Sequence, residues 1–442
     1  MNGPIVADAE RITLHVPFRE RIADWNELLV HQWQVVEMIR LSTDSSDIVG
    51  WGETLPYYTW GRVTDDAIAR IRGRRLFELL GDDSLGAGLQ MAAYDAAGKA
   101  AGVPVHRLFN LPVVRRSCPI AWWNHDMPAE LLAAEASDAI AGGYIAHKMK
   151  ARPWIDLFEQ IDAISGVTPP HYRIDMDWND TLLSVGNAAR ILSELDRYER
   201  VALYEGPIPQ RDIEGYQYLR RKAQKPIALH FGHPPFPTCV RAEMCDGFVV
   251  SGGVSSVLNQ GLLTSAFDKS LFLQLVGTGW TTTMMAHLGA VIPAARWPAV
   301  TCMNNFSDDL LASPLELQGG YLRVPDGPGL GVEPDLAAIE RFRVPENPIA
   351  PAFRLPRRSS ILSVERGGGR VTHYASMWRT TLIDDEQRPA ATVGPQLWDD
   401  FLAGNQPVDE RGVRLTFRHD DGSAEWKELY DRAVLGPVAS GV

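Results

Sequence analysis

The stretch from residue 144 to residue 231 decides the fold. It contains YIAHKMK (144–150), RIDMDWND (173–180), ALYEGP (202–207) and PIALHF (226–231), four short apolar runs that each end in ionisable side chains. Side chains alternate between the two faces of a strand, so Lys148 and Lys150 share one face, as do Asp175 and Asp177. The runs repeat at about the length of a strand, a crossover helix and the return. This pattern predicts parallel strands that bring lysines and acids together at their carboxyl ends.

Four more runs extend the pattern: CPIAWW (118–123), GFVVSGG (247–253), LFLQLVG (271–277) and AVTCMNN (299–305). Segments with apolar residues at helical spacing lie between the runs. Eight strands of this kind close into a barrel more readily than they stay open. The sequence therefore predicts an α/β protein whose residues 116–325 form a (β/α)8 barrel, with its active site at the carboxyl ends of the strands.

The pattern differs on both sides of the barrel. Residues 1–115 mix strand-like and helical segments and predict an α+β capping domain, in which the loop at 56–60 is either packed or a lid over the substrate. Residues 326–350 are rich in turn residues and are expected to return to the cap. Residues 351–442 predict a β-rich extension with two hairpins around glycine turns, at 359–378 and 413–430.

Composition limits the function classes. The net charge of −12 and the pI near 5.4 give no basic surface for a nucleic-acid partner. The four cysteines show no CxxC spacing and are expected to be reduced, structural thiols. No membrane span and no leader segment are predicted, so we expect a cytoplasmic protein.

Several motifs resemble the mandelate racemase/muconate lactonizing enzyme branch of the enolase superfamily, over residues 1 to about 345. They are GWGETLP (50–56), AAYDAAGKAAGVPVHRLF (92–109), HKMK (147–150), DMDWND (175–180), YEGPIPQRDIEGYQYLR (204–220) and PDGPGLGVEPD (325–335). Their order and separations carry the resemblance.

The resemblance implies a cap over a barrel, Mg²⁺ held by three carboxylates on successive strands, and abstraction of a proton α to a substrate carboxylate. By this resemblance Asp175 and Glu205 match the first two metal ligands, Lys150 the usual base, and Lys148 the contact to the substrate carboxylate. A weakly acidic α-proton requires a cation and ammonium donors to stabilise the enediolate. The alternative is an ion-pair network without chemistry.

The third metal ligand departs from the family. The fifth strand reads PIALHF, so His230 or Phe231 occupies the position of the expected carboxylate. His230 is a candidate metal ligand, together with Asp175 and Glu205, or a catalytic acid/base, and Asp177 is a candidate replacement oxygen. Two carboxylates and one imidazole suit Mn²⁺, Fe²⁺ or Zn²⁺ more than a purely oxygen site does. Because the resemblance implies Mg²⁺, the expected cofactor is Mg²⁺ or Mn²⁺.

The opposite wall of the predicted barrel carries few acid/base groups. The sixth strand ends in Ser251, Gly252 and Gly253, and the seventh is followed by Gly279. Chemistry on one face of the substrate carbon is therefore expected: a lyase or isomerase acting on a small carboxylate, either a sugar-acid-like dehydratase or a cycloisomerase, with assembly into a homo-oligomer. The alternative is a divergent barrel with lost or non-standard catalysis that binds a ligand or serves as a scaffold.

Overall fold

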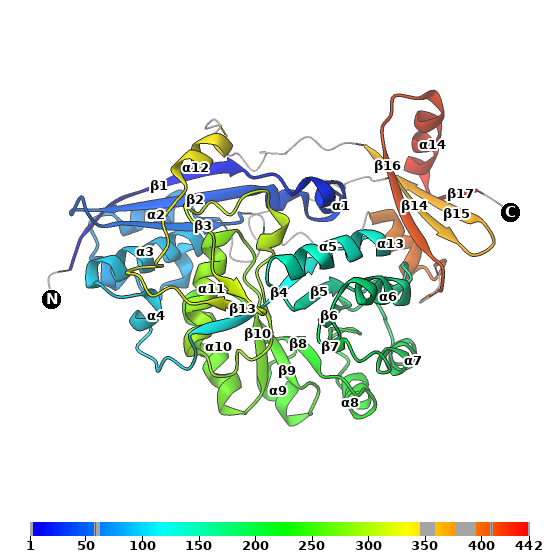
Figure 1. The fold of residues 1–442 in the computed structure, drawn as a ribbon, viewed down its shortest axis with the longest axis horizontal. Coiled ribbons are helices and arrows are strands. Elements are labelled where there is room, and N and C mark those ends of the chain that lie inside the picture. Colours follow the sequence, from blue (N-terminus) through cyan, green and yellow to red (C-terminus); the bar gives the residue numbers. More distant parts are fainter. Residues whose placement is uncertain are drawn as a thin grey trace.

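The computed structural model describes residues 3–56, 58, 62–344, 359–375, 395–406, 408 and 410–440. Three parts follow one another along this chain (Figure 1): a cap in blue, a barrel in cyan to green, and an extension in orange to red. None of the described helices is long and apolar enough to cross a membrane. All four cysteines are buried free thiols.

The cap is an antiparallel sheet with a helix packed against it. Strands β1 (Val6–His15), β2 (Val35–Thr43) and β3 (Val49–Thr54) lie in that order, and α3 (Ala87–Ala101) packs on them. A Cβ atom at Gly50 would lie 2.0 Å from a backbone oxygen of α3, so this close approach requires glycine. The GWGETLP and AAYDAAGK motifs therefore form one packing unit.

Short helices complete the cap. They are α1 (Glu20–Val30), η1 (His31–Gln34), α2 (Asp65–Ile71), η2 (Leu76–Glu78), η3 (Asp83–Leu85) and α4 (Val105–Leu108). Of the predicted loop at 56–60, residues 57, 59 and 60 lie outside the described part of the chain.

Each of the eight predicted runs contains a barrel strand. These are β4 (Ser117–Asn124), β5 (Ala146–Lys150), β6 (Arg173–Asp177), β7 (Val201–Glu205), β8 (Ile227–His230), β9 (Gly247–Val250), β10 (Ser270–Leu273) and β11 (Ala299–Val300). Parallel pairing runs in chain order from β4 to β10, and β11 pairs with β4. A parallel bridge between Gln274 and Val300 closes the ring, which confirms the predicted barrel.

Helices connect the strands and cover the barrel. They are α5 (Ala129–Ala141), α6 (Leu157–Val167), α7 (Val185–Leu195), α8 (Ile213–Lys222), α9 (Phe236–Arg241), α10 (Val254–Ala266) and α11 (Gly279–Val291). After β11 the chain forms the 3-10 turn η4 (Met303–Asn305) and leaves the barrel.

The cap lies at the carboxyl ends of the barrel strands, as the sequence predicts. The backbone N–H of Arg19 donates to the carbonyl of Asn305, just after β11, at 2.9 Å. The ring of Trp33 in the cap lies 5.3 Å from the ring of Trp123 near the end of β4. Glu53, at the end of β3, accepts hydrogen bonds at the start of α11. The cap therefore closes over the barrel mouth.

The chain then returns to the cap. Strands β12 (Leu317–Gln318) and β13 (Tyr321–Arg323) form a hairpin that pairs with β4. The carboxylate of Asp95 in α3 accepts the N–H of Leu330 at 2.8 Å and the N–H of Trp51 at 2.9 Å. Helix α12 (Leu336–Phe342) contacts β1. Residues 345–358, where the sequence predicts the change from return segment to extension, lie outside the described part.

The extension contains a four-stranded sheet, in line with the predicted β-rich segment, together with two helices. Strands β14 (Ser360–Arg366) and β15 (Arg370–Ala375) form the first predicted hairpin, and the sheet runs β16–β14–β15–β17. Its other elements are α13 (Pro395–Leu402), β16 (Arg414–His419), α14 (Ala424–Leu435) and β17 (Val438–Ser440).

The second predicted hairpin, at 413–430, is wrong. The segment forms β16 and then α14, because the Ser423 hydroxyl accepts the N–H of Trp426 at 3.1 Å and starts a helix there.

The extension packs on both the barrel and the cap of its own chain (Figure 1). Trp154, between β5 and α6, packs edge-on against Trp398 and Phe401 of α13, with ring centroids 5.8 and 5.2 Å apart. On the cap side, the rings of Trp25 and Phe417 lie 4.8 Å apart. These buried aromatic contacts tie the three parts together.

Candidate active site at the barrel mouth

Strand register brings the predicted site residues to one side of the sheet. Between β5 and β6, Lys148 lies opposite Asp175 and Lys150 lies opposite Asp177. Between β6 and β7, Asp177 lies opposite Glu205. Because alternate side chains share a face, all five point the same way. The two lysines and the three carboxylates therefore occupy neighbouring layers of one wall.

Lys148 is a buried cation surrounded by oxygen atoms. Its Nζ lies 2.6 Å from Glu205 Oε2 and 3.3 Å from Asp177 Oδ2, and it donates to Gln274 Oε1 at 2.8 Å. The ammonium also lies 4.8 Å from the centre of the Phe272 ring. Although burial acts to lower it, the carboxylates of Glu205 and Asp177 raise the pKa of Lys148 above its usual value. Lys148 is therefore held in its charged form.

Lys150 lies nearer the solvent. Its Nζ is 2.5 Å from Asp177 Oδ2 and donates to Asn179 Oδ1 at 2.9 Å, and 11% of its side chain is exposed. Burial lowers the pKa of Lys150, helped by the positive charges of Lys148 and Arg152 and opposed by Asp177. A lysine whose pKa is lowered releases its proton more readily and can act as a base.

Asp177 is the common partner of both lysines. One of its oxygens, Oδ2, contacts the ammonium groups of Lys148 and Lys150. Although burial acts against ionisation, these two cations hold the pKa of Asp177 well below its usual value. Asp177 is therefore a charged bridge between the lysines.

Asp175 is paired elsewhere. Its Oδ1 lies 2.7 Å from Nε of Arg173, which is two residues earlier on the same strand face. Burial raises the pKa of Asp175, although Arg173 acts to lower it. The predicted first metal ligand thus already has a guanidinium partner.

Glu205 contacts a lysine and a histidine. Its Oε2 contacts Lys148, and its Oε1 lies 3.2 Å from Nε2 of His230. The His230 side chain is 34% exposed. Both carboxylate oxygens of Glu205 are buried, and the 2.6 Å contact between Lys148 Nζ and Oε2 is the shorter of the two. The structure therefore brings Lys148, Lys150, Asp177, Glu205 and His230 into one cluster.

The donor set does not fit a resident divalent cation as it stands. Among the described residues, no three His, Cys, Asp or Glu side chains group so that they would hold a metal ion. Arg173 neutralises Asp175, and Lys148 neutralises Glu205. A divalent cation beside them would meet these positive charges at short range. The ligand set Asp175, Glu205 and His230 stays a prediction.

Two polar side chains of the cluster, Gln274 and Asn179, were not predicted from the sequence. Gln274 accepts from Lys148, and its Nε2 donates to the hydroxyl of Tyr58 in the cap at 3.4 Å. Asn179 accepts from Lys150 and also from Nη2 of the buried Arg152 at 3.1 Å. The signal for Gln274 is present in the sequence, because it is a lone polar residue in the apolar run LFLQLVG.

Arg152 fixes the loop that follows β5. Its Nε donates to Asp126 Oδ1 at 3.0 Å, and its Nη1 donates to the carbonyl of Trp178 at 3.2 Å. Together with the bond to Asn179, these contacts connect the β5–α6 loop to the acceptor of Lys150.

The wall expected to carry few acid/base groups serves to dock the cap. The carboxylate of Asp83 in η3 accepts the N–H groups of Ser255 and Ser256, at 2.9 and 2.8 Å, at the start of α10. A Cβ atom at Gly253 would lie 2.3 Å from Cγ of Asp83, so glycine is required for this contact. The glycines after β9 therefore have a structural function.

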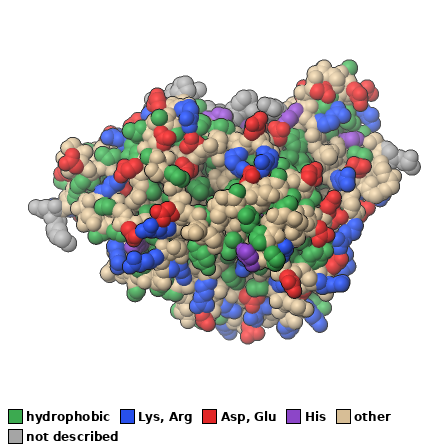
Figure 2. All heavy atoms as spheres, viewed as in Figure 1, with side chains coloured by type: hydrophobic (Ala, Val, Ile, Leu, Met, Phe, Trp, Pro, Cys, Tyr) green, Lys and Arg blue, Asp and Glu red, His purple; other side chains and the backbone are tan. Residues whose placement is uncertain are grey.

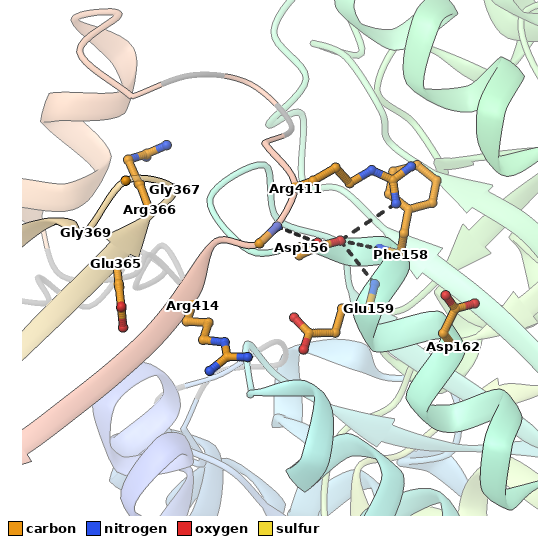
Figure 3. Close-up of a pocket in the computed structure, with 12 residues that line it drawn as sticks. Asp156, Phe158, Glu159, Asp162, Glu365, Arg366, Gly367, Gly369, Arg411 and Arg414 are labelled. Carbon is orange, nitrogen blue, oxygen red and sulfur yellow. Dashed lines mark hydrogen bonds and ion pairs between the residues drawn. The ribbon is translucent and has the colours of Figure 1, made fainter.

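A cavity of about 620 Å³ lies away from the lysine cluster, between the barrel and the extension (Figure 3). Asp156, Glu159 and Asp162 line one side, and the turn after Arg366 lines the other. Glu365, Arg411 and Arg414 also line it, and none of the lining residues belongs to the motifs that resemble the enolase superfamily. Figure 2 shows acidic and basic side chains interspersed over the face it draws. We therefore place the candidate active site at the barrel mouth.

Comparisons with known proteins show what this chain is similar to. The family described as Enolase C-terminal domain-like matches residues 131–338. A D-galactonate dehydratase of Ralstonia nicotianae is 24% identical over 303 residues, which span 61% of this chain and 75% of the relative. Muconate cycloisomerase 1-2 of Acinetobacter lwoffii is 26% identical over 295 residues, spanning 63% of this chain and 73% of the relative.

Solved structures show the same fold. A 2-chloromuconate cycloisomerase from Rhodococcus opacus superposes with a TM-score of 0.62 at 19% identity, covering 78% of this chain and 100% of that chain. An N-succinyl Arg/Lys racemase from Bacillus cereus superposes with a TM-score of 0.62 at 16% identity, covering 77% and 98%.

The fold and the site define a barrel enzyme with an α+β cap. The match to the Enolase C-terminal domain-like family and these relatives support membership of the enolase superfamily and an enzyme of the lyase or isomerase kind. Members of this superfamily generally depend on a divalent cation.

Proposed function

We propose that this protein removes the α-proton of a small carboxylate substrate and forms an enediolate, as a dehydratase of a sugar-acid-like hydroxy acid or as a cycloisomerase. The observation that carries the proposal is the lysine pair: Lys150 has a lowered pKa, and Lys148 is held charged beside it. Abstraction of an α-proton requires a base to take the proton and a cation to stabilise the negative charge that forms. Lys150 and Lys148 match these two roles. Curated relatives that are sugar-acid dehydratases and muconate cycloisomerases support both reaction classes.

Each lysine has its own role in this proposal. The α-carbon–hydrogen bond breaks, the proton goes to the lone pair of neutral Lys150, and the electrons move into the substrate carboxylate. Lys148 donates to an oxygen of that carboxylate and stabilises the growing negative charge. Both groups come from β5, so the reaction takes place on one face of the carbon. This geometry favours syn elimination or cyclisation over racemisation.

The proposal includes a metal ion only as a prediction from the sequence. Mg²⁺ or Mn²⁺ at Asp175, Glu205 and His230 is the arrangement that the sequence predicts, and such an ion would polarise the substrate carboxylate. Arg173 already pairs with Asp175, and Lys148 already pairs with Glu205. The roles proposed for Lys148 and Lys150 do not use the ion.

Isotope exchange tests the function. The purified protein is incubated in D₂O with sugar acids, amino-acid derivatives and muconate-like diacids, once with EDTA and once with Mg²⁺. We expect deuterium at the α-carbon of at least one acid and no exchange with Lys150→Ala. If no acid exchanges or reacts under either condition, a barrel that binds a carboxylate without turnover is the better description.

A further inference from the structure

The ammonium of Lys148 occupies an oxygen-lined position of the kind a metal ion would take. Carboxylate oxygens from β6 and β7 and the amide oxygen of Gln274, just after β10, surround it within 3.3 Å. Only 2% of the side chain is exposed. Oxygen donors from several strands around one buried charge are typical of hard-cation sites.

Glu205 is paired with Lys148. Both carboxylate oxygens of Glu205 are buried, and the Lys148 ammonium lies within hydrogen-bonding distance of Oε2, at 2.6 Å. A buried carboxylate without such a partner is strongly disfavoured. Glu205 therefore requires a cation, and Lys148 supplies it.

A divalent ion would compete with this arrangement. Besides Lys148, the guanidinium groups of Arg152 and Arg173 lie around the three carboxylates of β6 and β7, and Arg173 pairs directly with Asp175. An added ion of charge two would be repelled by these groups, and it would have to displace Lys148 from Glu205. The carboxylates are thus neutralised from within the chain.

Resting on the proposed function, we propose that Lys148 is the resident cation of this active site and takes the place of the divalent metal. Its ammonium has three N–H donors, of which Gln274 accepts one, so a donor remains for the substrate carboxylate. The substrate oxygen then replaces the longer contact to Asp177 at 3.3 Å. Lys148 stabilises the enediolate, while Lys150 holds the abstracted proton.

A metal titration without substrate tests this proposal. Wild-type protein, dialysed against EDTA, is titrated with Mn²⁺ and followed by electron paramagnetic resonance and by its thermal unfolding temperature. We expect no saturable binding to the wild type. Lys148→Met removes the ammonium but keeps the length of the side chain, so Mn²⁺ affinity should rise at least about tenfold. The matched control, Lys427→Met on the exposed face of α14, should behave like the wild type.

Saturable Mn²⁺ binding to the wild type that is lost in Asp175→Asn would overturn the proposal, and this result does not depend on whether Lys148→Met folds. Isotope exchange separates the proposal from the function on which it rests. Exchange that persists in EDTA supports both. Exchange that requires Mg²⁺ would contradict the proposal that Lys148 replaces the metal, and it would still support the lyase or isomerase function. Absence of exchange contradicts the function, and the Mn²⁺ titration still decides the position of the cation.

Discussion

Two side chains near the barrel mouth are candidates for the base, and single substitutions separate them. Lys150→Ala is expected to lower the rate of α-hydrogen exchange about 10²- to 10⁴-fold, because it removes the group that takes the proton. His230→Ala should have a smaller effect, since its Nε2 faces Glu205 at 3.2 Å. The measurement is deuterium incorporation by NMR, with Lys427→Ala as a surface control. If His230→Ala loses exchange and Lys150→Ala keeps it, the histidine is the base.

A pair of buried histidines makes stability depend on pH. His106 and His287 lie with their Nδ1 atoms 3.1 Å apart, and Nε2 of His287 contacts the carbonyl of Leu330. Burial lowers the pKa of His106, helped by Arg107 and opposed by Asp326, and burial lowers that of His287 to about 4. The unfolded chain, with a usual histidine pKa near 6.5, binds these protons first.

Stability from this pair is therefore complete above about pH 6.5 and is lost as the pH falls towards 4. We expect the free energy of unfolding to fall by about 1–3 kcal/mol between pH 7 and pH 5. Urea unfolding at both pH values measures it, and His287→Leu should show a smaller difference. An equal difference in the variant would assign the pH dependence to other groups.

At the scale of residues, the alternation of side chains along each strand predicts which members of the site share a face. Lys148, Lys150 and Asp177 share a face by sequence position alone, and the structure brings them together. The same alternation puts Arg173 on the face of Asp175, and their ion pair gives Asp175 a partner outside the lysine cluster. Partners from distant segments, such as Gln274, depend on the closure of the barrel and not on any local pattern.

At the scale of single elements, α11 depends on a residue of the cap for its start. The N–H groups of Thr278 and Thr281 donate to Glu53 Oε1 at 2.6 and 2.9 Å, and the Thr278 hydroxyl donates to Oε2. Glu53→Gln replaces a carboxylate oxygen by an NH₂ group, which cannot accept the hydrogen bond from the Thr278 hydroxyl. We expect a loss of about 1–3 kcal/mol in the free energy of unfolding.

Urea unfolding tests this, with Glu340→Gln on the exposed side of α12 as the control, for which a change within about 0.5 kcal/mol is expected. Equal stability of both variants would show that the helix end does not need the carboxylate.

Elements with strict periodicity were predicted correctly, and elements set by one capping residue were not. All eight barrel strands follow from short apolar runs at a regular repeat. Helix α14 was predicted as the second strand of a hairpin, because the alternation in VRLTFRH is followed by a glycine turn. Ser423 instead caps a helix that begins at the next residue. Gly253 was interpreted as part of a wall with few acid/base groups, although the close approach of Asp83 is what requires a glycine there.

At the scale of the whole molecule, the extension is positioned to stabilise the active-site wall. Gly412 donates its N–H to Asp156 Oδ2 at 2.7 Å, and Oδ1 of Asp156 caps α6 (Figure 3). The rings of α13 pack on Trp154, two residues after Arg152. Through Asn179, Arg152 is connected to Lys150. The extension therefore holds the loop that positions the proposed base.

Phe401→Ala tests this coupling. The ring is buried and lies 5.2 Å from that of Trp154, so its removal should cost about 3–5 kcal/mol of stability in the extension. Amide hydrogen exchange should then become faster at residues 151–156 of the barrel as well, and α-hydrogen exchange on the substrate should slow because Asn179 and Lys150 lose their fixed partner. Leu402→Ala, a half-exposed neighbour on the same helix, is the matched control and should change stability by less than about 0.5 kcal/mol. If Phe401→Ala loosens the extension while residues 151–156 keep their protection, the extension is an appendage that folds beside the active site without supporting it.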